Sequence, residues 1–140
     1  MCKDNNFIIL FSSIKKKLYK ILNSKLKEYN LSIIETIYLL IIEDSKNGIS
    51  FKDLTIQADC DKGITTRVIM GLKMKKLVSF DYKVFHVTNE GKELVLRIKS
   101  VLRDFKDDLL NKIGSDELNM FYDRLNMFNN ILEGELKCLN

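Results

Sequence analysis

Residues 50–76 read SFKDLTIQADCDKGITTRVIMGLKMKK, and this stretch decides the fold. Ser50 and Asp53 have the spacing of a capping box, which predicts a short helix over residues 51–58. Asp61 can cap a second helix that continues to about residue 76. The expected apolar face of this second helix consists of Ile64, Val68, Ile69, Leu72 and Met74. Two short helices joined by a three-residue polar turn are typical of a helix-turn-helix.

A β-hairpin is expected directly after these helices. Residues 77–80 and 84–87 are short and β-prone, and Asp81-Tyr82-Lys83 between them can form a tight turn. A helix-turn-helix followed by such a hairpin predicts a winged helix.

Longer helices are expected on both sides of this motif. Ser32 and Glu35 form a capping box that predicts a buried helix over residues 33–44. Thr88 can cap a long helix over residues 89–113. A first helix over residues 7–29 has an apolar stripe made of Leu10, Ile14, Leu18, Ile21, Leu22 and Leu26.

The last helix, which Ser115 is expected to cap, carries a seam close to that of a coiled coil. Its members, at steps of three and four residues, are Leu118, Phe121, Leu125, Phe128 and Leu132. A twofold dimer would bury this seam, and an intramolecular helical hairpin is the alternative. We therefore expect a mostly α protein with a small β-hairpin wing, in a single domain over residues 1–140. The winged helix-turn-helix lobe would span residues 30–88, and the dimerisation helices residues 1–29 and 89–140.

Composition suits a soluble protein with a positively charged centre. Of the 140 residues, 46% are apolar and 30% charged, and proline is absent, which leaves few breaks for long helices. Residues 46–92 hold nine basic and five acidic side chains, so this segment carries a net charge of 9 − 5 = +4. A positive surface is what neutralisation of phosphate requires.

Several classes of protein are not expected. No stretch reaches the roughly 18 apolar residues of a membrane span, and no signal peptide is evident, so the predicted location is the cytoplasm. The cysteines Cys2, Cys60 and Cys138 are scattered, which predicts reduced thiols and no metal site. The sole histidine, His86, falls in a predicted wing strand, and no nucleophile or phosphate-loop motif occurs. We therefore expect neither an enzyme nor a cofactor.

Four segments resemble the MarR family of bacterial transcription regulators. They are residues 31–40 (LSIIETIYLL), 51–54 (FKDL), 64–78 (ITTRVIMGLKMKKLV) and 87–92 (VTNEGK). The last is similar to the family's Leu-Thr-x-x-Gly motif at the start of the fifth helix. The resemblance covers nearly the whole chain, and it implies a homodimeric transcription regulator, such as a repressor, that binds double-stranded DNA.

Two departures from the family pattern concern the wing. Where the family usually has glycine before the Leu-Val that starts the wing, this chain has Lys76. The family's Asp-x-Arg-Arg type of loop is reduced here to Asp81-Tyr82-Lys83. Reading of the minor groove by the wing is therefore not predicted, although Lys83 can still contact a phosphate.

The N-terminal residues of the second helix of a helix-turn-helix enter the major groove. Arg67 can donate a bidentate pair to guanine O6 and N7, and Lys62 can contact phosphate or guanine. Gly63 permits close approach of the backbone. The predicted DNA-binding set is Lys52, Lys62, Gly63, Thr65, Thr66, Arg67 and Lys83; Lys73 and Lys75 are expected to be merely solvated. Two copies of the helix at 61–76 would read a pseudo-palindromic operator.

Three further hypotheses concern regulation and rival functions. The resemblance implies release of DNA by a small aromatic or phenolic ligand, held in an apolar pocket between the dimer helices and the lobe. Cys60 is the candidate for a redox-responsive regulator, and Cys2 and Cys138 can form an intermolecular disulfide, although inert thiols are the alternative. The rival function is a winged-helix module that binds protein and not DNA, which the short wing and modest net charge favour.

Overall fold

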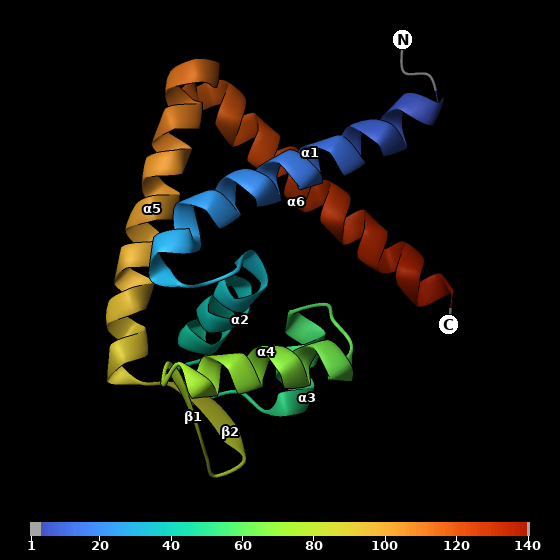
Figure 1. Cartoon of the computed structure of the whole chain (residues 1–140). Helices are drawn as coiled ribbons and strands as arrows, with labels where there is room; N and C mark the ends of the chain where they lie inside the picture. The colour runs from blue at the N-terminus through green and yellow to red at the C-terminus, as the bar shows by residue number, and fades with distance from the viewer. Residues whose placement is uncertain (1–3, 140) are drawn as a thin grey trace. The chain divides into compact units, whose positions relative to one another are not determined.

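The computed structural model describes residues 4–139 of the chain. They form two compact units, one ending at Lys99 and the other beginning at Ser100. The elements, coloured along the chain in Figure 1, are α1 (Asp4–Leu26), η1 (Lys27–Tyr29), α2 (Ile33–Asp44), α3 (Phe51–Gln57), α4 (Lys62–Met74), β1 (Val78–Asp81), β2 (Val84–Val87), α5 (Asn89–Ile113) and α6 (Ser115–Cys138).

The first unit contains a winged helix-turn-helix, as predicted. Helices α3 and α4 form the helix-turn-helix, and the antiparallel β1–β2 hairpin projects from the C-terminal end of α4 (Figure 1). The core is built from side chains of α1 to α5 and of the hairpin. Its members include Leu26, Tyr38, Leu39, Ile42, Leu54, Leu72, Phe85, Val95 and Ile98.

Local side-chain caps set most of the helix starts. At α2 the Ser32 hydroxyl accepts from Glu35 N, and Glu35 Oε1 accepts from Ser32 N at 3.1 Å, so the predicted capping box is confirmed. At α5 the Thr88 hydroxyl accepts from Gly91 N at 3.0 Å, as expected. The prediction for Ser115 is wrong: Gly114 precedes α6 with a φ of 97° and gives no side-chain cap. Because glycine alone adopts such a φ without strain, the break lies at Gly114 and Ser115 already belongs to the helix.

Only the C-terminal part of α1 belongs to the core. Leu22 and Leu26 are buried, and Asn23 Oδ1 accepts from Ile33 N at 2.8 Å, which ties α1 to the start of α2. The rest of the predicted stripe, Leu10, Ile14, Leu18 and Ile21, is exposed. The helix therefore presents an apolar surface that its own unit does not cover.

The hairpin has a tighter turn than expected. Asp81 pairs with Val84 at the end of the ladder, which leaves Tyr82 and Lys83 as a two-residue turn. Their φ angles of 49° and 65° are both left-handed, as a type I′ turn requires. Ile49 adds a bridge that the sequence did not predict, because Ile49 N donates to Phe85 O and Phe85 N donates to Ile49 O.

In the second unit, most of the predicted seam of α6 is exposed. Leu118 is buried and Phe128 is half-buried. Phe121, Leu125 and Leu132 are exposed to 50%, 38% and 44%. Helix α6 therefore leaves apolar side chains open to a partner.

Candidate nucleic-acid interface

The N-terminal end of α4 is fixed by its cap and by the turn before it. Asp61 Oδ1 accepts from Ile64 N at 2.8 Å, which confirms the predicted cap. In α3, the Ser50 hydroxyl accepts from Asp53 N at 3.1 Å, as one half of the predicted capping box. Asp59 turns the chain between the helices with a left-handed φ of 54°. The first turn of α4 is thereby held at the surface.

Helix α4 has a buried face and an exposed face. Thr65, Val68, Ile69 and Leu72 are buried. The exposed residues are Lys62, Gly63, Thr66, Arg67, Met70, Lys73 and Met74. The prediction that Met74 belongs to the apolar face is wrong, because Met74 lies half a turn from the buried residues. Lys62, Gly63, Thr66 and Arg67 lie together on the exposed side of the N-terminal half.

Thr65 does not belong to the DNA-contacting set, which corrects the prediction. Its side chain is fully buried, and its Oγ1 lies 2.8 Å from Tyr38 Oη and 3.0 Å from Thr55 Oγ1. Threonine fits here because its hydroxyl meets partners from α2 and α3 while its methyl group packs in the core. The hydroxyl cluster of Tyr38, Thr55 and Thr65 thus fixes the rotation of α4 about its own axis.

Burial raises the pKa of Tyr38 to about 12, although the hydrogen bond with Thr65 acts in the opposite direction; Cys60 raises it further. The phenol is therefore protonated throughout the physiological range. A neutral hydroxyl can both donate and accept, so it can hold its place in the cluster with Thr65.

Arg67 and Lys62 have free cationic groups. Both are exposed, and within residues 4–139 neither has an acidic partner at ion-pair distance. Arg67 borders a shallow hollow of about 270 Å³ together with Ile34, Glu35, Ile64 and Val68. The Thr66 hydroxyl donates to Lys62 O at 2.8 Å, so its proton is engaged inside the helix.

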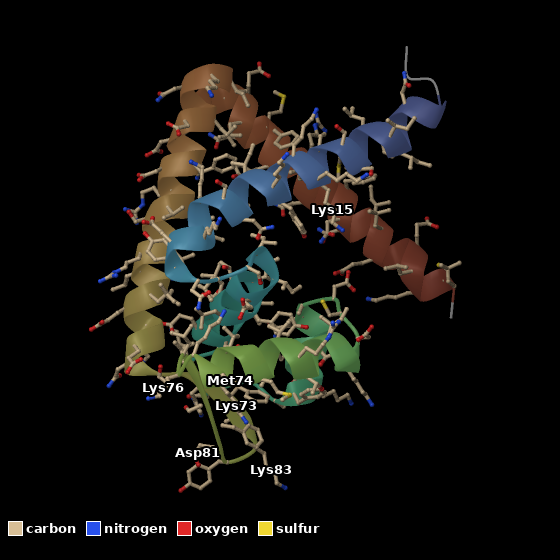
Figure 2. The ribbon with its side chains drawn as sticks, viewed as in Figure 1. Lys15, Lys73, Met74, Lys76, Asp81 and Lys83 are labelled. Atoms are coloured by element: carbon tan, nitrogen blue, oxygen red, sulfur yellow. The ribbon has the colours of Figure 1, made fainter. Side chains whose placement is uncertain are left out.

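Lys52 and Lys83 lie on other elements. Lys52 is exposed in the first turn of α3. Lys83 lies at the tip of the hairpin and points away from α4, with Asp81 beside it (Figure 2). Lys73 Nζ lies 5.3 Å from the ring centre of Phe80 and 5.8 Å from that of Phe85, which pair with each other next to the turn-closing pair of the hairpin. Lys73 therefore braces the wing by cation–π contacts and is not merely solvated.

Lys75 links α4 to α2, which also corrects the prediction of a solvated lysine. Its Nζ donates to Glu35 Oε2 at 2.8 Å, to Glu35 Oε1 at 3.0 Å and to Asn30 O at 2.6 Å. Gly71 makes room for this contact, because a Cβ there would lie 3.2 Å from Glu35 Oε2. Because Lys75 and Glu35 are 40 residues apart in the chain, no local sequence pattern predicts their contact.

We expect Glu35→Gln to destabilise the protein at neutral pH and not in acid. Burial alone would raise the pKa of Glu35, but hydrogen bonds from Lys75 and Ser32 outweigh burial and hold it below the ordinary 4.5. A lowered folded-state pKa contributes stability above the pKa of the unfolded chain, and this is lost as pH falls through the folded-state value. Urea unfolding should show a loss of about 1 kcal/mol at pH 7 that shrinks toward pH 3.

Glu93→Gln is the control for that variant, because Glu93 is exposed on α5 and should show no such difference. An equal loss for Glu35→Gln at both pH values would contradict the assignment.

Other predicted features have definite places. Cys60 is half-buried in the turn before α4, and its thiol donates to Ala58 O at 3.4 Å. Cys138 is exposed, and Cys2 lies outside the described residues. Among residues 4–139, no group of three or more His, Cys, Asp or Glu side chains is arranged to hold a metal ion. In the same part of the chain, none of the helices combines the length and the apolar run that crossing a bilayer demands.

A hollow lies along α1, and the residues that line it all belong to that helix. Its volume is about 660 Å³, and it is lined by Ser12, Lys15, Lys16, Tyr19, Lys20 and Asn23. The Nζ of Lys15, labelled in Figure 2, lies 5.5 Å from the ring centre of Tyr19. The lysines give this hollow a positive charge. The apolar pocket expected between the dimer helices and the lobe stays a prediction.

Sequence reasoning missed Met70, which is exposed between Arg67 and the end of α4. A helical projection would have found it, since positions 63, 66, 67, 70 and 74 share one side of a helix with 3.6 residues per turn.

By sequence, the chain matches no family model and no curated protein. Its fold, however, matches solved structures over most of its length. A MarR transcriptional regulator from Methanosarcina mazei Go1 gives a TM-score of 0.83 at 20% identity, over 95% of this chain and 94% of that chain. MepR of S. aureus, in a complex with DNA, gives 0.75 at 18% identity, over 88% and 94%.

The transcriptional repressor CouR, bound to p-coumaroyl-CoA, gives a TM-score of 0.77 at 13% identity, over 86% of this chain and 88% of its own. Together these matches establish that the chain has the winged-helix fold of the MarR regulators.

Proposed function

We propose that the chain is a transcription regulator of the MarR family that acts in the cytoplasm and binds double-stranded DNA through α4. One observation carries the proposal: the N-terminal half of α4 presents Lys62, Thr66 and Arg67 to solvent, and no acidic partner in the described chain neutralises the two cations. The DNA complex of MepR, which has the same fold, supports the assignment.

In the proposed complex, the first turns of α4 enter the major groove. Arg67 donates its planar guanidinium to O6 and N7 of a guanine, which is the commonest specific contact to a base. Lys62 and Lys52 contact phosphates on either side of the groove, and Gly63 lets the backbone come close. Selection of bound fragments from random duplexes tests this directly, because a specific regulator enriches one motif and an accidental cationic surface enriches none.

The proposed assembly is a homodimer formed through the terminal helices. The apolar side chains of Phe7, Ile8, Ile9, Leu10 and Phe11 on α1 are exposed to between 40% and 73%, and α6 exposes Phe121, Leu125 and Leu132. A surface that exposes this many large apolar side chains is typical of a protein–protein interface. A second copy would place two α4 helices about 34 Å apart, for a pseudo-palindromic operator.

Sedimentation equilibrium at micromolar concentration checks the assembly. The expected mass is twice the 16.3 kDa of the chain, independent of salt, because the proposed interface is apolar. A species of 16.3 kDa under these conditions would contradict the dimer.

For regulation, we propose release of DNA by a small aromatic acid. The lysines that line the hollow beside α1 favour a carboxylate or another anionic group, and the ring of Tyr19 offers an aromatic contact. CouR, which has the same fold, binds p-coumaroyl-CoA. Such a ligand must prefer the conformation that does not fit the operator. Phenolic acids that neither stabilise the protein against heat nor release DNA would contradict this proposal.

The double variant Tyr82→Asn, Lys83→Gly is expected to raise the stability of the protein and to lower its affinity for DNA. Both native residues have a left-handed φ, which Asn-Gly adopts with less strain, so we expect the variant to gain about 1 kcal/mol of stability. Loss of the Lys83 phosphate contact should lower affinity for DNA several-fold. Thermal unfolding and operator titration measure the two effects, and unchanged affinity would remove the wing from the interface.

The rival proposal, a winged-helix module that binds protein, is favoured by the short wing and by the modest net charge of +4; Asp81, labelled in Figure 2, ends β1 next to the turn. It predicts that no duplex binds even at low salt. A redox-responsive variant of the regulator, in which Cys60 is modified, predicts that peroxide lowers operator affinity, and Cys60→Ser distinguishes it.

A further inference from the structure

Two side chains on the exposed face of α4 are apolar. Met70 and Met74 are exposed to 56% and 82%. They lie opposite the buried residues of α4, and Figure 2 shows Met74 on the helix close to the base of the hairpin. At these positions the methionine side chains add little to the packing of the protein. Their apolar surface is therefore free to contact a binding partner.

Around Met70, few side chains of α4 can donate a hydrogen bond to DNA. The Thr66 hydroxyl proton is engaged by Lys62 O at 2.8 Å. Gly63 contributes no side chain to this face, and a Cβ there would lie 3.3 Å from Oδ1 of the capping Asp61. Arg67 remains the strong donor on this side of the helix.

The base edges of the major groove offer only one apolar group, which is the C5-methyl group of thymine. A methionine side chain is flexible and polarizable, so it can adapt to such a group. Met70 follows Arg67 by three residues, which is about 4.5 Å along the helix axis. A base contacted by Met70 would therefore lie within two base pairs of the guanine contacted by Arg67.

We infer that Met70 reads the C5-methyl group of a thymine in each half-site, so that the preferred duplex carries an A·T pair within two base pairs of the guanine of Arg67. The inference rests on the proposed function and adds a sequence preference to it. Met74, about 6 Å farther toward the C-terminal end of the helix, lies beyond the residues that enter the groove and does not share this role.

Replacement of thymine by deoxyuridine tests the inference, because it removes the methyl group and leaves every hydrogen-bonding group in place. Duplexes selected from a random pool would be made with each thymine replaced in turn, and their affinities measured with the full-length protein. We expect one thymine in each half-site at which deoxyuridine weakens binding about fourfold, and about fifteenfold when both half-sites are changed.

Three variants assign the effect to its residue. Met70→Ala should bind the thymine and deoxyuridine duplexes within twofold of each other, whereas Met70→Leu, which keeps an apolar side chain, should remain sensitive. Met74→Ala is the matched control and should keep the full sensitivity. Circular dichroism confirms that each variant is folded, as the exposure of both methionines leads us to expect.

Two results would overturn the inference. One is a selected duplex that binds tightly and shows no sensitivity to deoxyuridine at any thymine, which would leave the proposed function intact. The other is a sensitivity that persists in folded Met70→Ala. Absence of binding to any duplex would overturn the proposed function and, with it, this inference.

Discussion

Gly91→Ala is expected to destabilise the protein by about 3 kcal/mol, the largest effect on stability that we predict. A Cβ at this position would collide with the carbonyl oxygen of Leu77 and would lie 2.6 Å from Val87 Cγ1. The Leu77 carbonyl cannot move away freely, because it accepts from Thr88 N at 3.0 Å. The first turn of α5 would therefore be forced away from the base of the wing.

Thermal unfolding measures this effect. For a chain of this size, a loss of 3 kcal/mol corresponds to a fall in Tm of about 10 °C. Gly134→Ala is the control with the opposite sign: Gly134 lies inside α6 with nothing within 4 Å of an added Cβ, so alanine should stabilise the helix by up to about 1 kcal/mol. Equal effects of the two substitutions would contradict the packing at Gly91.

Arg67→Ala is expected to lower operator affinity by about a thousandfold and to leave the fold unchanged. A bidentate contact to guanine accounts for about 2 kcal/mol, and a dimer makes it twice. The side chain is exposed and has no ion-pair partner in the described chain, so its removal should change stability by less than about 0.5 kcal/mol. Titration of a labelled operator at fixed salt gives the affinity, and urea unfolding gives the stability.

Two controls sharpen this prediction. Arg97→Ala removes the same charge from an exposed site on α5 and should leave affinity nearly unchanged. Lys62→Ala should weaken binding to all sequences alike and reduce the salt dependence by about two phosphate contacts, one from each subunit, because Lys62 is assigned to the backbone. A loss for Arg67→Ala no greater than that for Arg97→Ala would exclude Arg67 as a reader of bases.

Local interactions explain why so much of the fold was predictable from sequence. The caps formed by Ser32, Asp61 and Thr88 join residues three positions apart, so their spacing is visible in the chain itself. The start of α2 follows directly from one such cap. Gly114 was misjudged because serine is a common cap, while the left-handed φ that glycine takes up is not visible in sequence.

The parts that sequence did not predict depend on distant partners. Thr65 and Thr66 are adjacent and chemically identical, yet one is buried against Tyr38 and the other is exposed. A helical projection would have separated them, because Thr65 shares the side of α4 that carries Val68, Ile69 and Leu72. The partners of the Thr65 hydroxyl, Tyr38 and Thr55, are not visible in the sequence. Lys75 likewise takes its role from Glu35 on another helix. Of the predicted DNA-binding residues, Thr65 alone is removed by its burial; the others are exposed and stay predictions.

The salt dependence of binding to a selected duplex tests the central claim most directly, namely that two copies of α4 bind DNA together. With phosphate contacts from Lys52, Lys62 and Lys83 of each subunit, the logarithm of the association constant should fall with the logarithm of salt concentration with a slope near −5. The stoichiometry should be two chains for each duplex. Failure of any duplex to bind at about 50 mM salt, or binding that is indifferent to salt, would contradict the account.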